Sequence, residues 1–198
     1  MKVIKYALVI GAALGAVSAN AQLGAVSKTD IEASGTKQGV YINYSPFARF
    51  SASGGGSSNG YIISAEKGIN QSKNGPGVLG GFYSRVNGGS FYSINYRQYM
   101  TADTSLGLAI LGGDNFNGKN DFNLYYMKDM PKTAGSPIDW QVGIGAYYDS
   151  GGKSINPDAG IKVSYPFQSG FSIDAAFWYF HRGGSSGNLL TLGVGYRM

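Results

Sequence analysis

The chain has 198 residues, with 16 Lys and Arg against 11 Asp and Glu, and only 14% of its residues are charged. The absence of cysteine excludes a disulfide framework, a thiol nucleophile and a thiolate metal site. A hydrophobic content of 43% and an aromatic content of 14% exclude a disordered chain, and glycine is abundant, at 32 residues.

The N-terminus has the pattern of a secretory signal peptide. Lys2 and Lys5 precede an apolar run from Tyr6 to Val17, which the small residues Ala19-Asn20-Ala21 follow. The run is shorter than the roughly 20 residues that a membrane-spanning helix needs, so we expect residues 1–21 to be removed during export. Because export removes two lysines, the remaining chain is only weakly basic, and nucleic acid is not an expected partner.

Residues 22–38 are polar and have no clear period, and residues 39–198 are predicted to form one all-β domain. Segments of about ten residues alternate there with turn-rich stretches, which predicts about ten antiparallel strands, with eight also possible. Their length suits strands that cross a bilayer at a tilt. The predicted strands are Gly39–Phe50, Gly60–Ile69, Val78–Val86, Ser90–Met100, Leu106–Gly112, Asp121–Met130, Asp139–Asp149, Asp158–Phe167, Phe171–Arg182 and Leu189–Met198.

Several predicted strands alternate between an apolar face and a polar or glycine-rich face. In the segment WQVGIGAYY, every second residue from Trp140 to Tyr148 is apolar, and Gln141, Gly143 and Gly145 lie between them. A soluble barrel turns its apolar face inward and a membrane barrel turns it to lipid, so alternation alone does not distinguish them. The glycine-rich polar face, the aromatic residues near strand ends and the low charge content favour a membrane barrel.

The last nine residues, LTLGVGYRM, keep this alternation to the end of the chain. They resemble the C-terminal β-signal of bacterial outer-membrane proteins: Leu192, Val194 and Tyr196 occupy its apolar and aromatic positions, and Met198 stands where a terminal aromatic residue is usual. The resemblance to small bacterial outer-membrane β-barrels implies a closed up-and-down transmembrane barrel, surrounded by outer-membrane lipid, whose last strand pairs with the first. It also implies periplasmic chaperones and the barrel-assembly machinery as partners during biogenesis, and a periplasmic place for residues 22–38.

Charged residues inside the predicted strands are expected to line the lumen, because a charge near the middle of a bilayer is costly. Pairing of these residues across the lumen predicts either an ion-paired plug or a selectivity filter. This set consists of Glu66, Arg85, Arg97, Lys162, Asp174 and Arg197.

Turn lengths predict which of these charges meet. Pairing Arg182 with Leu189 across GGSSGN places Asp174 opposite Arg197. Pairing the two phenylalanines that flank QSG places Ser164 opposite Asp174, with Lys162 on the diagonal. We therefore expect three ionic side chains to converge near the periplasmic mouth.

Two other groups could carry chemistry. His181 is the only histidine, and with Ser185 or Ser186 it could serve a lipid-modifying hydrolase. In the lipid A deacylase barrels the serine follows two positions after the histidine, where this chain has Gly183, so a histidine at the rim is favoured. Oxygen ligands in GGDNFNGKND could hold calcium, but Phe116 interrupts the EF-hand spacing and a turn is favoured.

The sequence therefore predicts an integral outer-membrane barrel that is structural or a narrow, porin-like passive channel with a charge-paired lumen. No catalytic residue, cofactor or metal is expected. The alternatives are a membrane-embedded hydrolase that uses His181, and a soluble periplasmic barrel that binds an apolar ligand.

The terminal methionine provides a test of the β-signal. Met198→Phe is expected to keep or improve insertion into the outer membrane, because an aromatic ring fills the terminal apolar position more specifically than a flexible thioether does. Met198→Asp is expected to impair insertion. Membrane fractionation of the three proteins measures this, and equal insertion of all three would show that the last strand is not the assembly signal.

Overall fold

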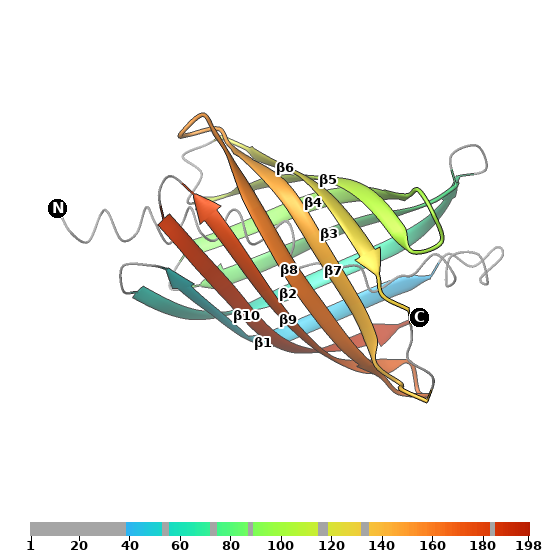
Figure 1. The fold of residues 1–198 in the computed structure, drawn as a ribbon. Helices are drawn as coiled ribbons and strands as arrows, with labels where there is room; N and C mark the ends of the chain where they lie inside the picture. Colours follow the sequence, from blue (N-terminus) through green and yellow to red (C-terminus); the bar gives the residue numbers. More distant parts are fainter. Residues whose placement is uncertain are drawn as a thin grey trace.

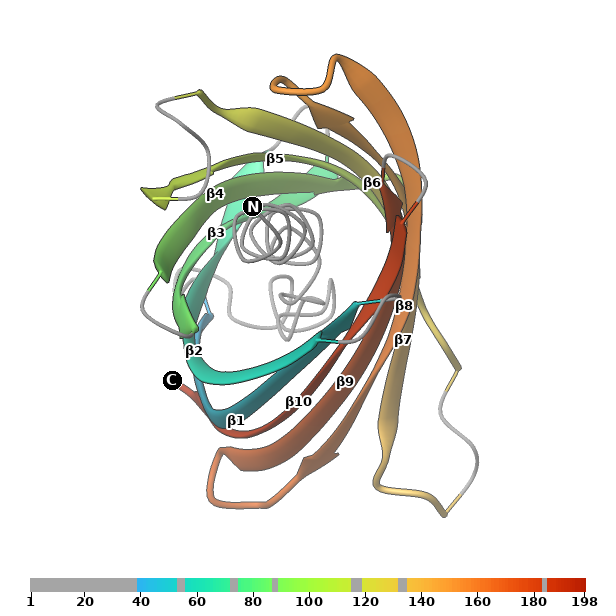
Figure 2. The same ribbon diagram turned by 90° about the vertical axis from the view of Figure 1, so that its left-hand side faces the viewer.

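A computed structural model of the chain describes residues 39–52, 56–71, 75–86, 89–114, 119–131, 135–182 and 185–198. These residues form ten antiparallel strands that close into one barrel (Figures 1 and 2). The closed all-β barrel expected from the sequence is confirmed. The strands are β1 Val40–Ala52, β2 Gly56–Gln71, β3 Gly75–Val86, β4 Gly89–Tyr99, β5 Thr104–Gly113, β6 Asp121–Asp129, β7 Asp139–Asp149, β8 Ser154–Pro166, β9 Phe171–Arg182 and β10 Ser185–Arg197.

The predicted signal peptide at residues 1–21 and the polar segment at residues 22–38 lie outside the described residues. Within the described residues, no helix is both long and apolar enough to span a membrane.

Three strands begin four residues earlier than the sequence predicts. β2 begins at Gly56, β8 at Ser154 and β10 at Ser185. The added residues are mostly glycine, serine and asparagine, which the sequence pattern assigns to turns. They join the ladders because strand pairing uses backbone groups and needs no apolar side chain.

The first and last strands close the barrel. Ile42 on β1 lies opposite Tyr196 on β10, and the ladder ends with the Met198 N–H donating to the Val40 carbonyl at 2.8 Å. The register shifts between Tyr44 and Phe47, where Pro46 lacks an N–H to donate. The C-terminal strand is therefore paired on both sides, by β1 and β9, and leaves no open sheet edge.

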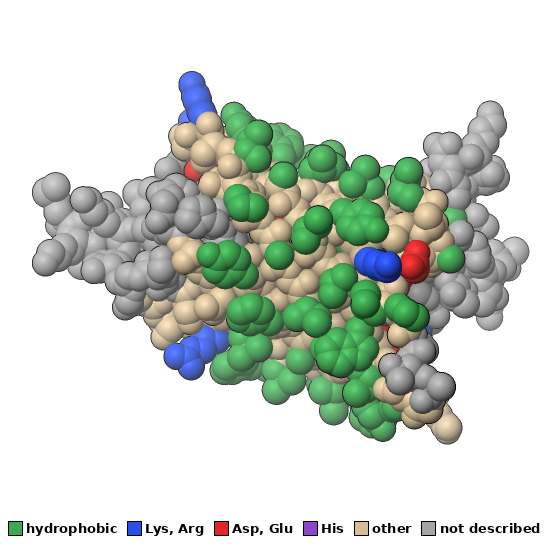
Figure 3. Space-filling view, viewed as in Figure 1, with side chains coloured by type: hydrophobic (Ala, Val, Ile, Leu, Met, Phe, Trp, Pro, Cys, Tyr) green, Lys and Arg blue, Asp and Glu red, His purple; other side chains and the backbone are tan. Residues whose placement is uncertain are grey.

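The outer wall of the barrel is apolar. Ile94 and Ile144 are 63% and 61% exposed, and hydrophobic side chains cover much of the visible wall in Figure 3, with charged side chains near its ends. Aromatic rings cluster on this surface: Phe171 and Tyr196 lie 4.6 Å apart between centroids. Such a large exposed apolar surface is typical of a transmembrane barrel, because contact with water would be unfavourable for these side chains and contact with lipid acyl chains is favourable.

Glycines on the inner wall make room for large side chains of the neighbouring strand. Gly160 pairs with Trp178, and a Cβ atom on Gly160 would lie 2.1 Å from Cδ2 of the indole. Gly107 pairs with Tyr125 in the same way, with a Cβ to Cζ separation of 2.3 Å. Both rings therefore cross directly over glycine backbone, which explains why the inward positions are rich in glycine.

The contact between Gly160 and Trp178 can be tested with a double-mutant cycle. Gly160→Ala is expected to lower the free energy of unfolding by about 1–3 kcal/mol, because the added methyl group overpacks the indole site. In a Trp178→Ala background the same change should cost less than about 0.5 kcal/mol. Urea unfolding of the refolded barrel measures both, and an equal cost in the two backgrounds would contradict the contact.

Candidate functional site

The inner wall carries a set of buried charges, which we call the lumenal charge belt. Five acidic side chains come from five different strands, and two bases accompany them. The belt consists of Glu66, Asp121, Asp149, Asp158 and Asp174 with Arg97 and Lys162.

Asp174 on β9 is the centre of one part of the belt and is only 4% exposed. Its Oδ2 accepts hydrogen bonds from the Tyr41 hydroxyl and from Asn43 Nδ2, the latter at 2.6 Å. Its Oδ1 accepts a hydrogen bond from Ser164 Oγ and lies 3.9 Å from Lys162 Nζ. Donors from β1 and β8 thus converge on one carboxylate.

A glycine explains how Tyr41 reaches Asp174 across the intervening strand. β10 lies between β1 and β9, and a Cβ atom on Gly195 of β10 would lie 2.4 Å from Cζ of Tyr41. Any larger residue would block the phenol ring. Lys162 Nζ lies 5.1 Å from the centroid of the same ring, within reach of a cation–π interaction.

Arg97 on β4 is the centre of a second part and is 1% exposed. Its Nη2 lies 3.3 Å from Glu66 Oε2 on β2, and its guanidinium lies 5.8 Å from the ring centroid of Tyr99. The Tyr99 hydroxyl donates to Asp129 Oδ2 at 3.0 Å, and Gln141 Nε2 donates to Asp129 Oδ1 at 2.8 Å. This chain of contacts links β2, β4, β6 and β7 around the wall.

The acids of β6 and β8 extend the belt toward the mouth farther from the C-terminus. Asp158 Oδ2 accepts a hydrogen bond from Asn123 Nδ2 at 2.8 Å. Asp121 accepts from the Tyr147 hydroxyl and from the N–H and Oγ of Ser150, the last two at 2.8 and 2.7 Å. Both carboxylates thus accept hydrogen bonds from side chains or backbone of neighbouring strands and turns.

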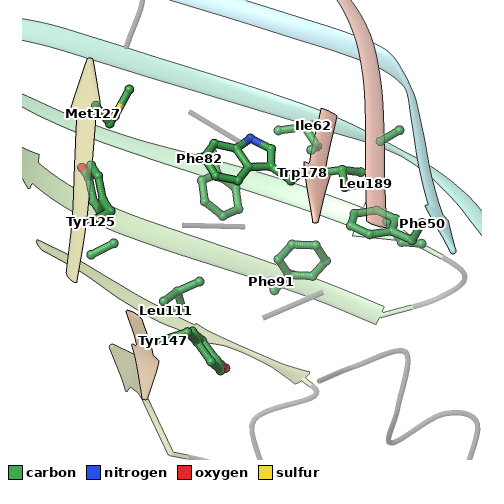
Figure 4. Packing of buried hydrophobic residues seen from close by; sticks show 13 residues of the cluster. Phe50, Ile62, Phe82, Phe91, Leu111, Tyr125, Met127, Tyr147, Trp178 and Leu189 are labelled. Atoms are coloured by element: carbon green, nitrogen blue, oxygen red, sulfur yellow. The ribbon is translucent and has the colours of Figure 1, made fainter. Parts of the chain in front are cut away.

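An apolar cluster occupies the inner wall beside the belt (Figure 4). Phe91 packs edge-on against Phe50 and Phe82, with ring centroids 6.3 and 6.2 Å apart. Phe50 and Phe91 come from β1 and β4, which are not neighbours in the barrel, so this contact bridges separate parts of the wall. The cluster therefore places aromatic side chains inside the barrel together with the charge belt.

Four of the six charged residues expected in the lumen are buried there and form two ion pairs, Glu66 with Arg97 and Lys162 with Asp174. A fifth, Arg197, is on the inner face at the mouth of the barrel, opposite the buried Tyr41. The lumen position expected for Arg85 is wrong: Ser84 and Val86 are buried, and Arg85 between them is exposed on the outer wall. Its strand carries apolar residues on both faces, so alternation did not identify the inner one.

The pairing expected between Asp174 and Arg197 is also wrong. β10 pairs Ser185 with Arg182, four residues from the predicted register, so Gly193 lies opposite Asp174. Arg197 lies opposite Tyr41 of β1, half-buried at the mouth near the C-terminus. The register of the other hairpin is as expected, with Ser164 opposite Asp174.

Sequence reasoning missed several members of the belt. Asp121 and Asp158 stand at the first positions of predicted strands, and neither was included among the charges expected in the lumen. Both share the inward alternation of their strands, and that signal would have placed them in the lumen. Nothing in the sequence connects Tyr41 with Asp174, because they are 133 positions apart.

The other predicted groups are only partly described. His181 lies opposite Ser186 in the ladder between β9 and β10, but the His181 side chain is outside the described residues, so the hydrolase stays a prediction. Residues 115–118 of the proposed calcium loop are also outside them. In the part of the chain that the structure describes, no group of three or more His, Cys, Asp or Glu side chains is placed to hold a metal ion.

No protein-family model matches the sequence, and no curated protein matches it either. Among solved structures, the chain is similar to the KdgM porin, with 14% identity over 80% of this chain and 98% of that chain and a TM-score of 0.42. It is similar to the NanC porin, with 13% identity over 81% of this chain and 99% of that chain and a TM-score of 0.41. It is also similar to the Acinetobacter baumannii outer membrane protein Omp33, with 9% identity over 81% of this chain and 98% of that chain and a TM-score of 0.40. The likeness is confined to the general barrel shape.

The Asp174 cluster predicts a large effect on stability. Asp174→Ala should lower the free energy of unfolding by about 3–5 kcal/mol, because Lys162 and three or more donors lose their acceptor in a buried setting. Asp103→Ala, in the turn between β4 and β5, is the control and should cost about 1 kcal/mol or less. Urea unfolding measures both, and a loss under about 1 kcal/mol for Asp174→Ala would show a hydrated site.

Proposed function

We propose that the protein is an integral outer-membrane barrel that acts as a narrow passive channel for small cations. The observation that carries this proposal is the composition of the lumenal charge belt, in which five buried acids face two buried bases. Acidic side chains lining a narrow passage raise the local concentration of cations and repel anions.

The outer membrane is the compartment that best suits the fold. A closed barrel satisfies every strand edge internally, which a lipid environment requires. The secretory pattern of residues 1–21 and the apolar alternation that runs to Met198 both support export and insertion at that membrane. We propose that the barrel-assembly machinery acts on this last strand, after periplasmic chaperones have carried the chain.

The two bases of the belt fix the positions of two of its acids. Arg97 and Lys162 hold Glu66 and Asp174 against the wall, so these carboxylates have fixed positions. Asp158 and Asp121 accept hydrogen bonds from amide, hydroxyl and backbone donors, which fix the positions of these carboxylates as well. A small cation can exchange its water for such oxygens, whereas the aromatic cluster excludes larger solutes.

A structural barrel without conductance is the second candidate. The contact between Phe50 on β1 and Phe91 on β4 favours it, because this contact joins strands that are not neighbours through the barrel interior. A soluble barrel with an apolar ligand is disfavoured, because large apolar side chains of the described strands are exposed on the outer wall, where a soluble barrel would face water.

Planar-bilayer recording of the detergent-refolded protein tests the channel. We expect small single-channel currents and a reversal potential in a salt gradient that shows cations preferred over anions by about threefold or more. Asp158 and Lys162 lie on the same strand and face and are 5% and 6% exposed, which makes them a matched pair. Asp158→Asn should reduce the cation preference, and Lys162→Gln should increase it.

Folding of each variant is checked by heat-modifiable migration on gels. A folded barrel without conductance would establish the structural alternative. Anion preference, or no response of the reversal potential to either substitution, would contradict the role given to the belt.

A further inference from the structure

The first four strands carry an unusual excess of basic residues. These strands contain four bases, and their single acid is Glu66, which faces the lumen. Arg97 pairs with it inside the barrel. Arg49, Lys67 and Arg85 are exposed on the outer wall. The outer face of β1 to β3 is therefore positively charged.

Arg49 and Arg85 lie on the two sides of β2. Arg49 pairs with Asn59 and Arg85 pairs with Tyr61, and these two partners point outward from the same strand two residues apart. The backbones of β1 and β3 are separated there by two strand spacings, roughly 10 Å. Long arginine side chains from both positions can therefore reach one group lying over β2.

An aromatic row marks how deep these arginines lie in the membrane. Tyr44, Tyr61 and Tyr83 follow one another across β1, β2 and β3, with neighbouring ring centroids 6.4 Å apart. Arg85 is two residues beyond Tyr83 toward the end of β3, and Arg49 lies beyond Tyr44 toward the end of β1. Tyrosine rings favour the boundary between acyl chains and headgroups, so both arginines lie at headgroup level.

The charge of this face has little compensation from the described residues. The outward positions of β1, β2 and β3 include no acidic residue among those described. Asp114 lies beyond β5, and its carboxylate accepts hydrogen bonds from the N–H and Oγ of Ser90 at 2.8 and 2.7 Å. These hydrogen bonds, with a smaller contribution from Arg85, lower the pKa of Asp114. Asp114 therefore offsets part of the charge of Arg85, and Arg49 has no acidic residue among the described outward positions of β1 to β3.

We propose that Arg49 and Arg85 form a binding site for an anionic, phosphate-bearing lipid headgroup on the outer wall of β1 to β3. Guanidinium groups bind phosphate oxygens through paired N–H donors, and here they project from a lipid-facing surface at headgroup depth. The tyrosine row provides a contact for the upper acyl chain or glycerol region. The site rests on the transmembrane barrel and is independent of whether the lumen conducts ions.

Lipid retention by the refolded full barrel tests the proposal. Native mass spectrometry from a neutral detergent counts bound dioleoyl phosphatidic acid against dioleoyl phosphatidylcholine, which has the same acyl chains. The variant is Arg49→Gln with Arg85→Gln. Its matched control is Lys67→Gln with Lys128→Gln, which removes two exposed or half-exposed outward bases at the other end of the barrel.

We expect the native protein to retain phosphatidic acid about tenfold or more over phosphatidylcholine, because Arg49 and Arg85 reach the same headgroup and their preferences, roughly fivefold each, combine there. Lys67 and Lys128 are on strands that are not neighbours, so they do not share a headgroup. The arginine double variant should lose about that factor, and the lysine control should stay within about threefold of the native protein. Higher salt should weaken retention.

Three outcomes would overturn the site: equal retention of the two lipids by the native protein, equal losses in the two double variants, or displacement of the lipid by millimolar inorganic phosphate. Heat-modifiable migration confirms that each variant is folded. The bilayer recordings remain a separate test of the channel, so failure of one proposal is distinguishable from failure of the other.

Discussion

The ladder between β1 and β10 is the constraint on which the rest of this structure depends. Lipid offers no hydrogen-bonding partners, so a strand that crosses a membrane must have its N–H and C=O groups paired on both edges. The pairs from Tyr41 with Arg197 to Ala52 with Gly187 provide this for the two terminal strands. Closure also defines an inside and an outside, and every later feature of the barrel follows from that distinction.

Large side chains fill much of the barrel interior, and glycines on neighbouring strands leave the space that these side chains occupy. Trp178 crosses Gly160, Tyr125 crosses Gly107, and the Tyr41 ring crosses Gly195. The last of these contacts connects packing with electrostatics, because it brings a hydroxyl from β1 to a carboxylate on β9. Glycine on the inner wall therefore allows close packing of the strands, and at Gly195 it also allows Tyr41 to contact Asp174.

Charge is sorted by face. Buried acids dominate the lumen, whereas the exposed charges on the outer wall of β1 to β3 are arginine and lysine. The sorting suits the two environments: an acidic passage attracts cations, and bases near a membrane surface attract anionic headgroups. The two proposed functions thus rest on one distribution of charge, with acids on the inner face of the barrel and bases on its outer face.

The sequence by itself predicted about ten strands, with eight also possible, and alternation with a period of two predicted the apolar face of most of them. It placed Asp174 and Lys162 on the inner face because successive side chains of a strand point to opposite sides. It could not determine register, since a shift of four residues leaves every side chain on the same face, which is why Asp174 was matched with Arg197 and not with Gly193. It also failed for Arg85, whose strand is apolar on both faces. Only the closed tertiary structure decided these points, because register and the meeting of β1 with β9 depend on how all ten ladders fit around one circumference.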